Sequence, residues 1–354
     1  MSLLDRYLAR AIIAATLVAL VGLLALDLFF ALVDEMGSLR AGRYEMQQAI
    51  VYVALTAPRR AYELFPAAAL LGGIFGLGAL AAGSELVALR AAGMSTARMA
   101  AGVTQVGLLL ALGAVLLGEQ VAPLAEAKAQ GLRTVARSGG AAYQASGGLW
   151  IRDGSRFIRI AKVLPGHRLA DVEVYTVGPD LRLEEAVRVR TAAYRDGRWQ
   201  LEDVARTVFA GDRLHTEHHG QERWPRLVSL ELLEALTVKP DKMAASTLYR
   251  YIGYLQANGL DAARYQVAFW GRFTTPLSGL VMLLVALAFA FGPLRSGGAG
   301  QRLLTGTLLG LAFYVLDRAV NQLGVVYGLV PWVSAFLPLA ALLLLALLAL
   351  RYVR

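Results

Sequence analysis

The stretch GSELVALRAAGMS, residues 83 to 95, is a charged break between two long apolar segments, residues 64–82 and 99–120. Each flanking segment has close to the roughly 20 apolar residues that an α-helix needs to cross a bilayer. Inside the break we expect a short amphipathic helix, with Ser84 as its N-cap and Gly93 as its left-handed end. The pattern therefore predicts two membrane-spanning helices joined by a short surface helix.

Two interpretations of this short helix are open on physical grounds. Helical spacing places Glu85 and Leu89 on one stripe, and Leu86 and Arg90 on another. The helix can be an interfacial turn between two spans, or a docking helix whose charges enter a groove on a soluble partner. No lysine of the chain lies in the Gly-Lys-Ser/Thr context of a phosphate-binding loop. Any ATP that drives this protein is therefore expected on another chain.

The composition is that of a membrane protein. Of 354 residues, 57% are hydrophobic and only 17% are charged, which is too apolar for an ordinary soluble domain. Cysteine is absent, so disulfides and thiolate metal sites are excluded. The first apolar segment is too long for a signal-peptide core and is expected to remain as a helix. Six spans are predicted, at residues 11–33, 64–82, 99–120, 273–292, 303–326 and 331–350.

A polar insert separates the third span from the fourth. From Tyr143 to about Val238 the sequence alternates apolar and polar residues, with Asp-Gly turn signals at 153–154 and 196–197. This predicts an all-β domain, a sandwich or an open β-jelly roll. The expected domains are residues 1–138 with three spans, 139–240 with the β-domain, and 241–354 with a linker helix and three spans.

The arginines fix the expected orientation. The insert is nearly neutral, so the net charge of +9 belongs mainly to the membrane part. With the N-terminus inside, each inner segment is basic, as the positive-inside rule requires. Both termini are then cytoplasmic, and the β-domain lies outside, which in a bacterium is the periplasm. The inner arginines are Arg6, Arg10, Arg90, Arg98, Arg295, Arg302, Arg351 and Arg354.

The linker between the insert and the fourth span has clear helix-end signals. A short helix is expected from Ser246 to about Ala257, ended by Gly259 in a left-handed conformation. Asp261 is the expected N-cap of the next helix. Such a linker would join the β-domain rigidly to the fourth span.

One outer loop breaks the orientation rule. Residues 34–60 carry Arg40, Arg43, Arg59 and Arg60 on the side predicted to lie outside. A basic outer loop is tolerated once other charges have fixed the topology. Alternatively, these guanidinium groups bind anionic head groups at the outer leaflet, because their geometry matches phosphate.

Three further features have both a structural and a functional interpretation. Asp27 and Asp317 lie within predicted spans, and can serve a proton path or be structurally paired, Asp317 with Arg318. The histidines in HTEHHG can share a metal ion, or belong to an exposed polar loop between strands. Glycines at four-residue spacing allow close helix packing. The residues concerned are His215, His218 and His219, and the pairs Gly72 with Gly76 and Gly306 with Gly310.

The stretch 83–95 closely resembles the inner-loop motif of the lipopolysaccharide export permeases, the LptF/LptG or YjgP/YjgQ family. Similar pieces occur along nearly the whole chain, and LDRY, FGPLRS and VYG are more similar to the G type of subunit than to the F type. The further matching pieces are LDRY at 4–7, APRRAYELFPAAALLGGIFGLGALA, GEQVAP at 118–123, GLW at 148–150, RYQVAFW at 264–270, FGPLRS at 291–296 and FYVLD at 313–317.

This resemblance implies an ABC-type exporter in the inner membrane of a Gram-negative bacterium. In that family two homologous permeases, F and G, pair with an ATPase dimer, LptB, and a single-pass subunit, LptC. Lipopolysaccharide is extracted from the outer leaflet and passes to periplasmic jelly rolls, LptA among them, that lead to the outer membrane. The chain is then a transporter subunit and not an enzyme, with ATP and magnesium on the ATPase and no nucleic-acid partner.

Carried onto this sequence, the resemblance makes residues 83–95 a coupling helix. Glu85, Leu86, Arg90 and Gly93 are the expected contacts with the ATPase. The first and fifth spans would form lateral gates with the partner permease.

The resemblance also suggests where the lipid binds. Phe65 and Phe313 are expected to line the cavity for acyl chains. Some relatives carry lysines near the end of the first span, where this chain has Ala31 and Gly37. The expected contacts with lipid A and inner-core phosphates are therefore the outer-loop arginines, Arg40, Arg43, Arg59 and Arg60.

Other classes of function remain open on the residues alone. A membrane protein that transmits force from an ATPase, as lipoprotein-releasing systems do, would also need a coupling helix and a large periplasmic domain. A proton-coupled transporter would use Asp27 and Asp317. A structural receptor for other envelope proteins needs no catalytic residues at all.

Overall fold

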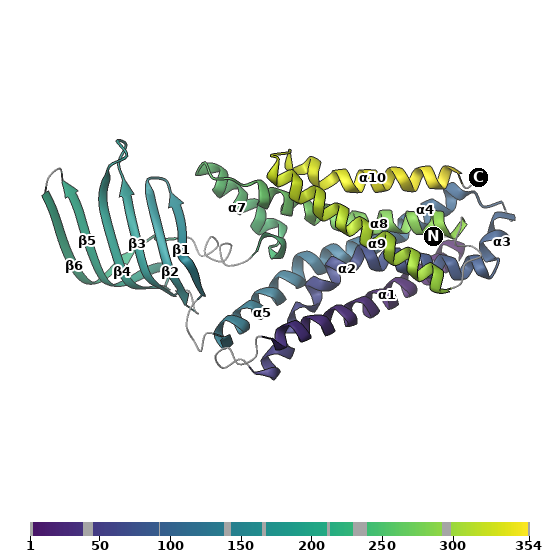
Figure 1. The fold of residues 1–354 in the computed structure, drawn as a ribbon, viewed down its shortest axis with the longest axis horizontal. Helices are drawn as coiled ribbons and strands as arrows, with labels where there is room; N and C mark the ends of the chain where they lie inside the picture. The colour runs from purple at the N-terminus through teal and green to yellow at the C-terminus, as the bar shows by residue number, and fades with distance from the viewer. Residues whose placement is uncertain are drawn as a thin grey trace.

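The computed structural model consists of a bundle of long helices with a β-sheet at one end (Figure 1). The sheet and the helix α7, Ala245–Ala257, lie beyond one end of the bundle, and the short helix α3, Glu85–Ala91, lies at the opposite end. The described chain begins and ends at the α3 end (Figure 1). The structure describes residues 3–37, 45–91, 93–137, 143–164, 168–210, 213–228, 239–291 and 299–352.

Five helical segments within these ranges are long and apolar enough to cross a membrane: Asp5–Met36, Met46–Ala82, Thr96–Arg133, Ala263–Phe291 and Pro331–Arg351. The protein is therefore a multi-pass membrane protein. The long helices are α1 (Leu3–Met36), α2 (Met46–Ala82), α4 (Thr96–Leu116), the π-helix η1 (Leu117–Val121), α5 (Ala122–Arg137), α8 (Ala263–Phe291), α9 (Ala299–Val326) and α10 (Pro331–Tyr352).

The predicted span at 303–326 is helix α9, which is not among these five segments; Asp317, Arg318 and Asn321 interrupt its apolar run. α8 ends beside α3, where the Arg90 guanidinium lies 5.8 Å from the centre of the Phe291 ring. α10 begins near the other end of α8 (Figure 1). The connecting helix α9 therefore runs back along the bundle, and its 28 residues measure roughly 42 Å at 1.5 Å per residue.

Two predicted spans are longer in the structure than in the prediction. The second begins at Met46, not at residue 64, and the third continues through η1 and α5 to Arg137. The added turns contain Pro58 and charged residues, which the apolar pattern excluded. They remain helical because carboxylates on neighbouring helices bind their arginines, as described below.

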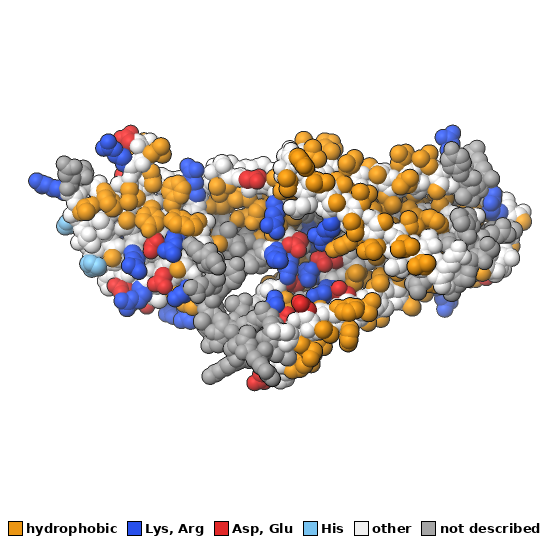
Figure 2. Space-filling view, in the orientation of Figure 1, with side chains coloured by type: hydrophobic (Ala, Val, Ile, Leu, Met, Phe, Trp, Pro, Cys, Tyr) orange, Lys and Arg blue, Asp and Glu red, His pale blue; other side chains and the backbone are white. Residues whose placement is uncertain are grey.

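α2 and α8 form the centre of the bundle. In their apolar windows 78% and 72% of the residues are buried, against 11% for α1. α1 instead exposes large apolar side chains, with Val18 73% and Val21 66% exposed. Apolar side chains cover much of the helical part in Figure 2. In a membrane such a surface contacts lipid tails or another apolar helix.

The glycine pairs lie where helices approach closely. Gly72 faces the backbone of Thr16 on α1, and a Cβ built on Gly76 would lie 3.0 Å from the Ala11 carbonyl oxygen. A Cβ on Gly306 of α9 would lie 2.8 Å from the Leu71 side chain. A Cβ on Gly310 would be in ordinary contact with Leu70 at 3.7 Å. The prediction of close packing is thus confirmed for Gly72, Gly76 and Gly306.

The insert forms one six-stranded antiparallel sheet in the order β1-β2-β3-β4-β5-β6. The predicted turns are confirmed: Gly154 has φ +62°, and Asp196 and Gly197 have φ +51° and +77°. The strands are Tyr143–Asp153, Arg156–Leu164, Arg168–Val177, Leu183–Arg195, Arg198–Ala210 and Arg213–Trp224. The all-β class is confirmed, but the described strands follow one another as a meander, whereas a jelly roll also pairs strands that are distant in sequence.

One face of the sheet is covered by the chain that follows it. Trp199 is fully buried and donates a hydrogen bond from its indole N–H to the Val228 carbonyl at 2.9 Å. Leu248 and Leu255 of α7 belong to the same core.

The predicted linker is confirmed as well. Gly259 has φ +66°, and the Asp261 carboxylate accepts from the Ala263 N–H at 2.8 Å. The linker helix and its exit into α8 therefore follow the capping signals in the sequence.

Candidate functional site

The coupling segment, residues 83–98, lies at the end of the bundle farthest from the sheet (Figure 1). Its helix α3 ends before Gly93, which has the predicted left-handed φ of +89°. Ser95 caps α4 by accepting from the Arg98 N–H at 3.2 Å. Ala88 and Arg90 are exposed, and Glu85 is half-buried. A soluble partner could therefore reach this segment.

Ser84 occupies the N-cap position that the sequence predicts, directly before α3. Its φ of +60° is left-handed, whereas N-cap residues typically have an extended backbone, so a hydrogen bond from its side chain stays a prediction. The Ser84 carbonyl still accepts the first helical hydrogen bond, from the Ala88 N–H at 3.0 Å. The chain reverses sharply after α2, and this tight turn determines the conformation of Ser84.

Both charged residues predicted to dock the ATPase also have contacts inside the chain. The Tyr7 hydroxyl of α1 donates to the Glu85 carboxylate at 2.8 Å. The Arg90 guanidinium lies over the Phe291 ring at the end of α8. α3 is thus connected to the first helix of each half of the membrane part. The side chain of Leu86 lies outside the described residues.

The arginines predicted to bind phosphate are paired with carboxylates where the structure describes them. Arg59 donates to Glu63 at 2.6 Å and to Glu126 at 3.1 Å. Arg60 donates to Asp27 at 2.6 Å. A phosphate that binds either arginine would therefore compete with these carboxylates for its N–H donors. Arg40 and Arg43 lie outside the described residues.

These pairs belong to a polar network between the bundle and the linker to the sheet. Glu126 of α5 is 2% exposed at its side chain, and it accepts from Lys242 at 2.6 Å as well as from Arg59. Glu119 in the π-helix accepts from the Ala245 N–H, at the start of α7, at 2.8 Å. Figure 2 shows acidic and basic side chains gathered near the middle of the molecule. The network fastens the linker to α5.

Neither this network nor one further ion pair is visible in the local sequence. Arg133 of α5 forms a bidentate ion pair with Glu35 of α1, in which Nε donates to Oε1 and Nη2 to Oε2, both at 3.0 Å. The partners are 98 residues apart in the chain, so no local spacing reveals them. The one feature of the sequence that indicated such pairs was the occurrence of glutamates just beyond the apolar part of the third span.

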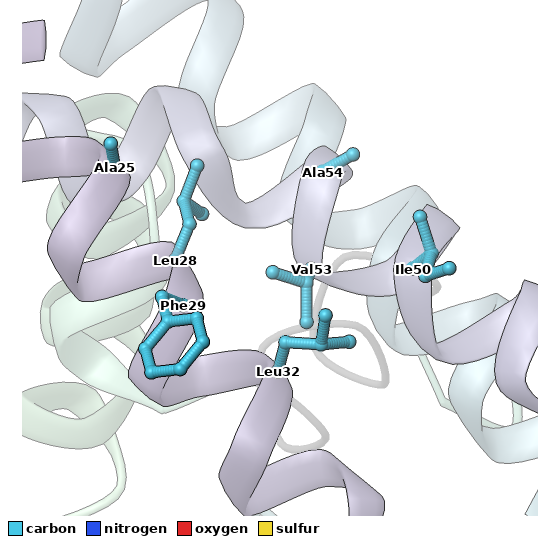
Figure 3. A pocket seen from close by; sticks show the side chains of 7 residues that line it. All are labelled: Ala25, Leu28, Phe29, Leu32, Ile50, Val53 and Ala54. Carbon is cyan, nitrogen blue, oxygen red and sulfur yellow. The ribbon is translucent and has the colours of Figure 1, made fainter.

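The two phenylalanines predicted to line a cavity pack inside the bundle. Phe65 is 5% exposed, and its ring lies against Gly279 of α8. Phe313 is partly buried against the same core. An apolar groove of about 260 Å³ lies elsewhere, between α1 and α2 (Figure 3). Its lining residues are Ala25, Leu28, Phe29, Leu32, Ile50, Val53 and Ala54.

The two aspartates predicted to lie within spans have polar partners. Asp27 pairs with Arg60, and the Asp317 carboxylate accepts from the Asn321 side-chain amide at 3.2 Å. The guanidinium of Arg318, the partner expected for Asp317, lies 5.5 Å from the centre of the Tyr314 ring. These contacts favour the interpretation that both aspartates are structurally paired.

The prediction that the histidines lie in a loop between strands is wrong, because they belong to the exposed strand β6. The Glu217 carboxylate lies 3.1 Å from the His215 ring nitrogen and 3.4 Å from that of His219. Hydrogen bonds from His219 and His215 hold the pKa of Glu217 below its ordinary value. Within the described ranges no three His, Cys, Asp or Glu residues are placed to hold a metal ion.

The fold and these sites define a class of protein: a multi-pass membrane protein with an antiparallel β-domain inserted between its helices and a charged loop helix at the opposite end. The sequence profile of the family described as "Lipopolysaccharide export system permease LptF/LptG" matches residues 6–352. The chain belongs to this family of lipopolysaccharide export permease subunits.

Curated relatives agree with the family and with the expected G type. The chain is 34% identical to the lipopolysaccharide export system permease protein LptG of Haemophilus influenzae, over 95% of this chain and 94% of that protein. It is also 34% identical to the LptG protein of Escherichia coli K12, over 97% and 96% of the two chains.

Proposed function

We propose that this chain is the membrane subunit of a lipopolysaccharide exporter that is powered by a separate ATPase dimer, LptB, docked on α3. The supporting observation is the accessible, charged helix α3, which is connected to α1 through Glu85 and to α8 through Arg90. Glu85, Leu86, Arg90 and Gly93 form the docking site. ATP and magnesium bind to the ATPase, and the hydrolysis of ATP moves α3 as a rigid body.

The lipid would move along the exposed side of α1. Phe29 and Phe30 are both 60% exposed there, and the groove between α1 and α2 is apolar (Figure 3). Acyl chains fit such a surface because its side chains are apolar and offer no hydrogen-bonding groups. Phe65 and Phe313, which were expected to line the cavity, pack instead in the core of the bundle.

The phosphates of lipid A and the inner core would bind at the end of the bundle nearer the sheet. Arg40 and Arg43 are the leading contacts. Arg59 and Arg60 would join them by releasing Glu63 and Asp27, whose side chains are 34% and 38% exposed and therefore accessible to solvent. A guanidinium binds phosphate as readily as carboxylate.

The location and the partners follow the same proposal. Both termini are cytoplasmic and the β-domain is periplasmic, in the inner membrane of a Gram-negative bacterium. The homologous permease LptF would face the exposed sides of α1 and α9, and LptC and LptA would receive the lipid. The supporting observation is that the described chain begins and ends at the α3 end (Figure 1).

A proton-coupled mechanism predicts that export is lost when Asp27 and Asp317 are both replaced, whereas an ATP-driven mechanism predicts that export continues. We expect the double variant Asp27→Asn/Asp317→Asn to keep ATP-driven export within about three-fold of the parent, because asparagine still accepts hydrogen bonds and a partly exposed ion pair contributes only about 1 kcal/mol or less. The measurement is lipopolysaccharide release from proteoliposomes that hold the whole complex. As the control, a protonophore is added to the parent complex. Loss of export both in the double variant and in the parent with the protonophore would favour proton coupling.

Affinity purification followed by mass spectrometry tests the proposal as a whole. The chain, extracted from its native membrane, should retain an ATPase, a homologous permease and lipopolysaccharide. Recovery without an ATPase would overturn the proposal.

A further inference from the structure

The start of α1 forms two hydrogen bonds with the coupling segment, one at the start of α3 and one after its end. At the first residue of α3, the Glu85 carboxylate accepts a hydrogen bond from the Tyr7 hydroxyl at 2.8 Å. After α3, Arg98 at the start of α4 donates to the Asp5 carboxylate at 3.1 Å. Asp5 is 5% exposed, whereas Tyr7 is 50% exposed. The first helix thus has one buried and one accessible attachment to the coupling segment.

The two helices attached to α3 differ in their freedom to move. α8, which Arg90 contacts through Phe291, has 72% of its apolar window buried, whereas α1 has 11%. A closely packed helix cannot shift without repacking its neighbours. α1 packs closely against α2 at Gly72 and Gly76, but its apolar window is largely exposed, so a movement of α3 requires less repacking along α1 than along α8.

Glu85 can bind the Tyr7 hydroxyl and a cation of a docked partner at the same time. Its Oε2 atom accepts from Tyr7, while Oε1 lies beside Gly83, 3.3 Å from where a Cβ would be. An ionised carboxylate accepts several hydrogen bonds. One oxygen can therefore bind an incoming cation while the other stays attached to α1.

We propose that Tyr7 is a positioning residue that fastens the coupling helix to α1, so that a movement imposed on α3 is carried into the first span. This inference rests on the proposed docking of an ATPase at α3. α1 has 34 residues, which is roughly 51 Å at 1.5 Å per residue. A displacement at Tyr7 then reaches the groove that Phe29 and Leu32 line at the far end of the helix (Figure 3).

The test is Tyr7→Phe in the complete complex, reconstituted in proteoliposomes that contain lipopolysaccharide. This variant removes the hydroxyl and keeps the ring. We expect the lipid released per ATP hydrolysed to fall roughly five-fold, because an accessible hydrogen bond contributes about 1 kcal/mol. The ATPase should still co-purify, and its rate of hydrolysis should stay within about two-fold. The matched control is Tyr327→Phe, at a tyrosine that is 76% exposed beyond the end of α9.

The ratio of lipid to ATP separates this role from a merely structural one. A variant that only unfolds part of the complex lowers export and hydrolysis together and leaves the ratio unchanged. An unchanged ratio in Tyr7→Phe would overturn the inference, and so would loss of the ATPase, which would make Tyr7 part of the docking surface.

Distance measurements provide a second test that does not depend on transport. The chain has no cysteine, so spin labels at Ala14→Cys on α1 and Ala88→Cys on α3 report a single distance. Both positions are exposed. With Tyr7 present the distance should stay the same when ATP is added, and in Tyr7→Phe it should change or broaden. Equal behaviour of the two proteins would contradict the inference.

The proposed docking site itself is tested by Glu85→Arg. If that variant binds the ATPase and exports normally, α3 is not the docking site, whatever Tyr7→Phe does. If Glu85→Arg loses the ATPase and Tyr7→Phe keeps the parent ratio, docking at α3 stands and the role of Tyr7 fails.

Discussion

Glu85→Arg is expected to abolish lipopolysaccharide export and to release the ATPase from the complex. The substitution reverses the one carboxylate of α3 and also removes the acceptor for the Tyr7 hydroxyl. Loss of a charged contact in an interface costs about 2 kcal/mol or more, which corresponds to roughly a 30-fold loss of affinity. The measurements are co-purification of the ATPase and ATP-dependent release of the lipid from proteoliposomes.

The matched control is Glu184→Arg, which makes the same charge change at an exposed glutamate of the β-domain. It should bind the ATPase and export as the parent does. Normal export by Glu85→Arg with the ATPase still bound would show that α3 does not dock it.

Gly72→Leu is expected to prevent assembly of the helical bundle. Gly72 of α2 faces the backbone of Thr16 on α1, so that even a Cβ would collide with main-chain atoms. α1 and α2 would have to separate, and overpacking of this kind costs about 3 kcal/mol or more. We expect a large fall in the melting temperature of the purified protein in detergent, together with low yield.

The control for this prediction is Gly113→Leu on α4, where a Cβ would have no neighbour within 4 Å. That variant should melt close to the parent. If Gly72→Leu melted as the control does, the close approach of α1 and α2 described above would be wrong.

Local signals in the sequence predicted most of the fold. The Asp-Gly turns placed two hairpins, Gly93 and Gly259 placed two helix ends, and the apolar segments placed the long helices. These features depend on neighbouring residues in the chain, so their physical causes can be recognised in a short window. The β-domain was harder, because alternation predicts strands but does not determine their order in the sheet.

The interactions that sequence could not predict all join distant segments. Glu126, the buried partner of Arg59, lies 67 residues away, although Glu63, its other partner, lies only four residues away on the same helix. α2 appeared to begin near residue 64 because its first turns are charged, and Arg59 and Arg60 meet Glu126 and Asp27 only in the folded bundle. Glu85 had a plausible partner in an ATPase, but its contact with Tyr7, 78 residues away, becomes visible only in three dimensions.

Photo-crosslinking of lipopolysaccharide to α1 tests the central claim most directly, namely that the lipid travels along the helices of this chain. A benzoyl-phenylalanine at Phe29, which lines the groove (Figure 3), should form an adduct that disappears when ATP is added. The same probe at Leu181, 88% exposed in the β-domain, provides the background. Absence of any adduct at Phe29, in a complex that still exports, would contradict the account and favour a protein that only transmits force.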